Sequence, residues 1–180
     1  MNLKSLSVLA TALAAASLAT PAYAITYVFS ANLSGAAETP PVVTSAFGAA
    51  VVTFDDAALT VSVQEVFAGL SSAATASHIH CCTTVAGTGT VGVALGLTGF
   101  PAVQTGFYNN TFTLSAASFS SLLAGSLGGK AYVNVHDATY PGGEIRGWLA
   151  AAPVPEPETY ALLLSGLAVV GWVARRRKVA

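Results

Sequence analysis

Three histidines are the residues of this sequence whose type and spacing could support chemistry. His78 and His80 are separated by one residue, His136 lies in a later segment, and the chain contains no other histidine. On a β-strand, side chains two residues apart lie on one face about 6.6 Å apart, which lets two imidazoles reach the same ion. Copper and zinc bind imidazole nitrogen at about 2.0–2.1 Å. If the two strands pair, a three-histidine site follows.

The apolar pattern predicts where these side chains point. Ile79 has the opposite parity to His78 and His80, and Val135 has the opposite parity to His136. Because side chains alternate between the faces of a sheet, the valine and isoleucine should face the core and the histidines should face away from it. We therefore predict that the three histidines bind copper or zinc on that face.

A fourth ligand would complete such a site. Cys82 shares the parity of His78 and His80, and Asp137 and Glu144 lie near His136 in the sequence. Any of the three could be that ligand. The alternative is that the histidines face solvent and bind nothing, because a His-x-His sequence on a strand is short and common.

The only two cysteines of the chain, Cys81 and Cys82, are adjacent. Neighbouring Cα atoms are about 3.80 Å apart across a trans peptide, below the usual ~4.4–6.8 Å of a disulfide, so a bond between them would be strained. On a strand the two thiols would point to opposite faces, with Cys81 buried and Cys82 beside the histidines. Three states therefore stay open: a vicinal disulfide, a free Cys82 thiol near the metal, and an intermolecular bond.

No catalytic set is recognised elsewhere. The sequence lacks a G-x-S-x-G or Walker motif and a convincing pair of carboxylates. Glu144 and Arg146 share a parity, which predicts an exposed ion pair with a structural role. The protein is therefore predicted not to be an enzyme.

The segments that must hold these residues alternate in the manner of β-strands. Leu59, Val61 and Val63 share one parity, with polar residues between them. Similar runs occur at Ile25–Leu33, Phe47–Phe54, Thr75–Cys81, Gly89–Leu95, Phe107–Leu114, Ala131–His136 and Glu144–Ala150. Ser115–Ala124 is predicted to form a helical turn or two, capped by Ser115 or Ser118. Seven or eight short strands predict an all-β protein, an antiparallel sandwich or Greek-key barrel.

The two ends of the chain are predicted to be targeting segments. Residues 1–24 combine Lys4, an alanine-rich apolar run and Ala22-Tyr23-Ala24, which indicates a signal peptide cleaved before Ile25. Residues 153–180 contain Pro155-Glu156-Pro157, an apolar segment over 160–174 that would form a transmembrane helix, and a basic cluster at 175–178. The basic cluster should stay cytoplasmic, so the domain before it should lie outside.

Residues 25–152 therefore form the folded domain. This segment has two basic residues against six acidic ones. An acidic domain without a basic patch argues against nucleic-acid binding.

Both the domain and the tail resemble known families. Ala76–His80, Tyr132–Asp137 and the block Tyr140-Pro141-Gly142-Gly143-Glu144-Ile145-Arg146-Gly147 look like the CHRD domain, found in chordin and in bacterial secreted proteins. That resemblance implies an immunoglobulin-like β-barrel distantly similar to Cu,Zn superoxide dismutase, but no established activity. Dismutase catalysis is not expected, because the dinuclear site of that enzyme needs more histidines than this chain has.

The tail looks like the PEP-CTERM sorting signal of Gram-negative bacteria, carried here by Pro155, Glu156 and Pro157 with Arg175, Arg176 and Arg177. The resemblance implies processing by an exosortase, which would remove the membrane helix and release or attach the protein at the cell surface. Association with exopolysaccharide follows from the resemblance alone.

The sequence thus predicts an exported, non-enzymatic protein of the cell surface or extracellular matrix. One alternative is a copper- or zinc-binding protein with a redox or metal-handling role. The other is an adhesion module that recognises another protein.

Overall fold

The computed structural model describes residues 25–152, 162–170 and 175. The first of these segments is the predicted all-β domain, and the prediction of the fold class is confirmed. Its strands are β1 (Thr26–Ser34), β2 (Phe47–Asp55), β3 (Thr60–Ala68), β4 (Ala74–His80), β5 (Val93–Gly96), β6 (Gly106–Thr113), β7 (Tyr132–Asp137), β8 (Ile145–Trp148) and β9 (Ala150–Ala151).

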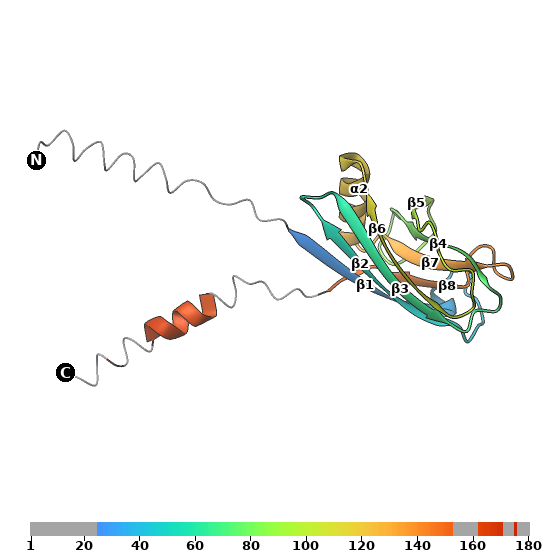
Figure 1. Cartoon of the computed structure of the whole chain (residues 1–180), viewed down its shortest axis with the longest axis horizontal. Coiled ribbons are helices and arrows are strands. Elements are labelled where there is room, and N and C mark those ends of the chain that lie inside the picture. The colour runs from blue at the N-terminus through green and yellow to red at the C-terminus, as the bar shows by residue number, and fades with distance from the viewer. Residues whose placement is uncertain (1–24, 153–161, 171–174, 176–180) are drawn as a thin grey trace, which may run out of the picture.

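The strands form a single antiparallel sheet in the order β5-β4-β7-β8-β1-β2-β3-β6, and β9 pairs with β1. The sheet curls over on itself, so that the long strands β1 to β3 lie across from β4, β7 and β8 (Figure 1). A hydrogen bond from Ser77 Oγ on β4 to Glu65 Oε2 on β3, 3.0 Å long, crosses the interior between the two halves. Strands that are distant in the sheet are therefore close in space.

Alternating apolar side chains fill the space between the two halves. Phe29, Val52 and Val63 on one half have no exposed surface, nor do Ile79 and Val133 on the other. The residues between them face outward, as the period of two requires. They include polar residues such as Ser30 and the apolar, exposed Val51 and Val66. The valine and isoleucine residues flanking the histidines therefore belong to the core, as predicted.

The α2 helix (Ala116–Leu127) covers one end of this core. The Ser115 hydroxyl accepts a hydrogen bond from Ser118 N–H at 3.2 Å, so Ser115 is the N-cap. From the helix Phe119 and Leu122 are buried, and the Phe119 ring meets Phe54 edge to face at 5.6 Å. The predicted helix is confirmed, and it is longer than expected.

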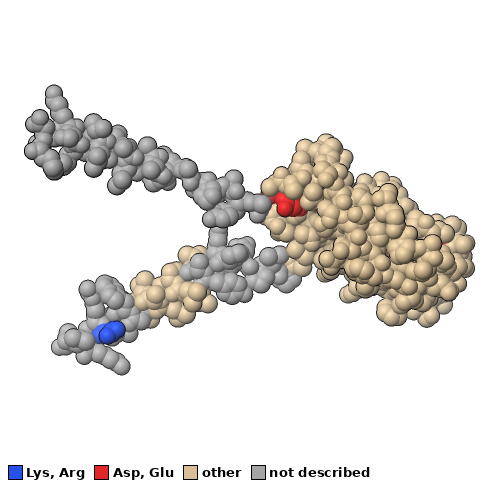
Figure 2. Space-filling model, in the orientation of Figure 1, with Lys and Arg blue, Asp and Glu red and all other residues tan. Residues whose placement is uncertain are grey.

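Charged side chains of the domain lie mostly inside. Eight residues of segment 25–152 are charged, and five of them are buried: Glu38, Glu65, Asp137, Glu144 and Arg146. The face of the domain in Figure 2 shows an acidic patch at one end and is otherwise uncharged. Since burying a charge is costly unless it is paired or hydrogen-bonded, each buried charge should have a structural partner.

The predicted strands differ from the observed ones mainly at their ends. The segment predicted as Gly89–Leu95 is a strand only at β5, and the predicted strand Glu144–Ala150 divides into β8 and β9. The predicted signal peptide and most of the predicted tail lie outside the described residues. Residues 162–170 form a helix. No helix among the described residues is long and apolar enough to cross a membrane.

Candidate metal centre

The three histidines come together because β4 and β7 are neighbouring strands, as the sequence analysis required. In the register of this pair His78 lies opposite Asn134, His80 opposite Tyr132, and His136 opposite Ala76. Each histidine belongs to β4 or β7, so the backbone of the sheet fixes where its side chain begins.

The imidazoles are close enough to share an ion. His78 Nδ1 and His136 Nε2 lie 3.1 Å apart, and one nitrogen from each of the three rings lies within 4.8 Å of the others. Nitrogens bound to one zinc or copper ion at ~2.0–2.1 Å in a tetrahedral arrangement are about 3.4 Å apart. Small rotations of the rings would therefore bring the three nitrogens to bonding positions.

Two backbone carbonyls orient the rings. His136 Nδ1–H donates to the carbonyl of Pro141 at 3.0 Å, and His80 Nδ1–H donates to that of Val91 at 2.7 Å. In each ring the bond to a carbonyl uses Nδ1, which is the usual way that proteins orient metal-binding histidines. His136 Nε2 lies 3.0 Å from Asn134 Oδ1 and 3.1 Å from His78 Nδ1. His80 Nε2 is buried and has no hydrogen-bond partner. A bound metal would satisfy that nitrogen.

The surroundings favour the uncharged form that metal ligands require. Burial lowers the pKa of His78, and the nearby His136 and His80 lower it further. Burial also lowers the pKa of His136, although the hydrogen bond to Pro141 partly opposes the shift. Both rings are therefore ready to bind a cation at neutral pH, since only neutral imidazole is a ligand.

A layer of buried polar side chains supports the site. The His80 ring stacks on the Tyr132 ring, with centroids 4.7 Å apart and planes at 6°. The Arg146 guanidinium lies 4.0 Å from the centre of the same tyrosine ring. Arg146 also forms a salt bridge with Glu38, at 2.9 Å, and donates to the carbonyl of Gly89 at 3.0 Å. These contacts hold His80 and the loop that contains Val91 in one place.

The two carboxylates considered as fourth ligands are used elsewhere. Glu144 is buried and accepts hydrogen bonds from Ser71 N–H at 2.9 Å and from the Thr44 hydroxyl at 2.5 Å. Asp137 accepts from Ser72 and from Tyr140 N–H, at 2.7 and 2.6 Å. Neither belongs to the group of potential ligands. Burial opposes ionisation of Asp137, but these hydrogen bonds outweigh it and lower its pKa.

The predicted surface ion pair is also wrong. Glu144 and Arg146 are both buried, and the salt-bridge partner of Arg146 is Glu38. Neighbouring loops cover this face of β7 and β8, so same-face parity did not mean exposure.

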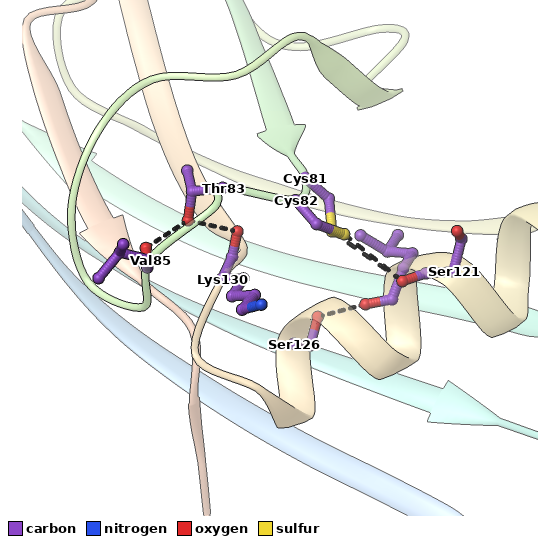
Figure 3. The surroundings of a disulfide bond; sticks show 8 residues. Cys81, Cys82, Thr83, Val85, Ser121, Ser126 and Lys130 are labelled. Carbon is purple, nitrogen blue, oxygen red and sulfur yellow. Dashed lines mark hydrogen bonds between the residues drawn. A yellow bond between two sulfur atoms is a disulfide. The ribbon is translucent and has the colours of Figure 1, made fainter.

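Cys81 and Cys82 form the vicinal disulfide that was one of the three predicted states. Both sulfurs lie against the Ser121 carbonyl of α2, at 4.0 and 3.6 Å (Figure 3). An added Cβ at Gly125 would overlap both of them, so this glycine makes room for the disulfide. The prediction that Cys82 lies beside the histidines as a ligand is wrong, because the chain leaves the strand after His80 and both sulfurs turn toward α2.

Sequence reasoning missed the supporting layer. Glu38 precedes the segment Thr39-Pro40-Pro41 and is more than a hundred residues from Arg146, so their pairing had no local signal. For Tyr132 and Asn134 a signal existed, because both share the parity of His136. No pattern in the sequence indicated that a second polar layer covers that face.

Comparison with known families identifies the domain. The family model of the CHRD domain matches residues 29–149. The chain belongs to the CHRD family. The match covers β4 and β7, the two strands that carry the three histidines. The PEP-CTERM protein-sorting motif matches residues 153–178 and marks an exported protein that is sorted by an exosortase. Searches of curated proteins and of solved structures gave no match.

Proposed function

We propose that this CHRD domain binds a copper or zinc ion at the cell surface through His78, His80 and His136, without catalysing a reaction. The observation that carries the proposal is the buried, unpartnered Nε2 of His80, a member of a group of three imidazoles whose ligand atoms lie within 4.8 Å of one another. Leaving a buried acceptor unpaired costs about 1–3 kcal/mol, and an ion would remove that cost. Three imidazoles suit Zn²⁺ and copper better than Mg²⁺ or Ca²⁺, which prefer oxygen ligands.

The proposal leaves one coordination position open. No carboxylate or thiol joins the three histidines among the described residues. Water or a small anion would complete the coordination, an arrangement that suits reversible binding of the ion. The vicinal disulfide supplies no ligand, because cysteine binds a metal ion as its thiolate.

Metal analysis of the full chain tests the proposal. The protein is loaded with copper or zinc, desalted and analysed by mass spectrometry beside the variant in which all three histidines are asparagine. Near-stoichiometric metal in the native chain and loss in the variant is the expected result. Equal trace metal in both would overturn the proposal.

A matched control excludes binding by any surface imidazole. Ser30 is exposed on β1, outside the histidine group, and Ser30→His in the triple-asparagine variant provides a lone histidine. That protein should remain free of metal. Thermal unfolding adds a second readout, because a ligand that binds only the folded state raises the melting temperature. Zinc should raise it in the native chain and leave it unchanged in His80→Gln.

The competing functions are a matrix protein associated with exopolysaccharide and an adhesion module. Neither requires the histidines. If the native chain binds no metal and the triple variant is retained at the cell surface as well as the native chain, one of these functions is favoured over metal binding.

A further inference from the structure

The sheet ends in two edges of very different character. At one end β5 has only four residues, and the register of its pairing with β4 is irregular at His80. At the other end β6 has eight residues and pairs with β3 in an uninterrupted register. Proteins usually protect an exposed edge by shortening it, by a bulge, or by a lysine or proline. The β5 edge has the first two protections.

The β6 edge has none of them. Its sequence, Gly-Phe-Tyr-Asn-Asn-Thr-Phe-Thr, contains no charged residue and no proline. Asn109, Asn110 and Thr111 are exposed in succession, so side chains on both faces of the strand reach solvent here. Within residues 25–152, no strand lies beyond β6 in the sheet. This edge is therefore open to another strand.

The backbone of β6 shows which groups are available. Leu114 N–H donates to the Leu59 carbonyl at 3.0 Å, so the even-numbered backbone groups face β3. Alternation then directs the groups of the odd-numbered residues outward, from Phe107 to Thr113. In agreement, Thr111 N–H is bonded to the Asn110 side chain at 2.8 Å and not to β3. An antiparallel strand would find a row of donors and acceptors, and the Thr111 N–H would exchange its bond to Asn110 Oδ1 for one to that strand.

We propose that the β6 edges of two copies of this chain pair antiparallel and form a continuous sheet across a twofold axis at Asn110. This register places Phe107 opposite the second Thr113, and Asn109 opposite the second Thr111. It uses all four outward-facing residues, and the two edges are self-complementary, as a twofold interface requires. No charge on β6 opposes the approach, and Val66, beside Phe107 on the same face, is exposed and apolar.

A cysteine at the axis tests the register. The two native cysteines are bonded to each other, so an introduced cysteine is the only free thiol. Residues directly opposite in a non-hydrogen-bonded antiparallel pair have Cα atoms about 4.5 Å apart, within disulfide range. Asn110→Cys in the full chain, purified in mild detergent and oxidised, should give a covalent dimer. Ser30→Cys on β1, which lies away from the edge, is the matched control and should not.

Asn110→Lys tests the association without a cross-link. It places two like charges opposite each other, which destabilises a strand pair. Sedimentation equilibrium should show a dissociation constant at least about tenfold higher than that of the native chain or of Ser30→Lys. A native chain that stays monomeric, or a dimer that Asn110→Lys leaves intact, overturns the proposal. Equal cross-linking by Asn110→Cys and Ser30→Cys also overturns the proposal. This comparison does not depend on the lysine variant, which could fail to fold.

Discussion

Replacing Glu65 with glutamine should stabilise the protein at pH 8 relative to the native chain, although a buried hydrogen-bonded residue is changed. Glu65 is buried on β3, where Ser77 Oγ donates to Oε2 at 3.0 Å and Oε1 has no partner. Burial raises the pKa of Glu65 to about 8, although the bond from Ser77 lowers it somewhat. The carboxyl is therefore protonated at neutral pH, and glutamine resembles that form in shape and in hydrogen bonding.

The magnitude follows from linkage. Below pH 4.5, the ordinary pKa of this group, the folded and unfolded states are both protonated and the full stability is present. Between pH 4.5 and about 8 only the unfolded chain loses the proton, so stability falls by ~1.4 kcal/mol per pH unit. Over that interval Glu65 makes the native chain lose about 5 kcal/mol, and glutamine removes this loss.

Urea unfolding at pH 5 and pH 8, with a chelator present to remove metal, measures the effect. The free energy of unfolding of Glu65→Gln minus that of the native chain should increase by about 4 kcal/mol between the two pH values. Taking the difference cancels contributions from the histidines, which both proteins share. Gln64→Glu places a carboxylate on the exposed face of the same strand and should show no such increase. Parallel pH curves for the native chain and Glu65→Gln would refute the reasoning.

Three further predictions follow from other contacts. Gly125→Ala should destabilise the protein by about 1–3 kcal/mol in thermal unfolding, and less when both cysteines are serine, although alanine is the better helix former. Arg146→Met should cost about 3–5 kcal/mol in urea unfolding by leaving Glu38 buried without its partner, and adding Glu38→Gln should recover part of this. Zinc affinity, measured by calorimetry, should decrease in acidic buffers, and His78→Ala and His136→Ala should each reduce that decrease, because burial lowers the pKa of both rings but protonation still removes them as ligands.

The positions of the histidines could be predicted because period-two alternation is local. Ile79 and Val135 are buried and flanked by residues of the opposite face, and that pattern is complete within each strand. The pairing of β4 with β7 could not be predicted from the sequence, and the three-histidine site was conditional on it. The structure supplies it through a register that places His78 beside Asn134, next to His136 along β7.

The predictions of a fourth ligand were wrong because the alternation of side chains between the two faces ends where a strand ends. Cys82 is the second residue after the end of β4 and Glu144 precedes the first residue of β8, so strand parity does not govern either side chain. Asp137 is the last residue of β7 and accepts hydrogen bonds from the loop at Ser72 and from the turn at Tyr140. A carboxylate at a strand end has backbone N–H groups within reach, and such bonds compete with any metal.

The buried charges explain why the proposed metal centre would not depend on a bound metal for its fold. Glu144 holds the segments of Ser71 and Thr44, Asp137 holds Ser72, and Glu38 with Arg146 holds the loop of Gly89. Each of these contacts closes without an ion, and the apolar core between the two halves of the sheet is continuous. A structural zinc site, by contrast, supplies the folding free energy of its domain. Here the histidines are placed by strands that other interactions already hold, so an ion would enter a site that exists before it arrives.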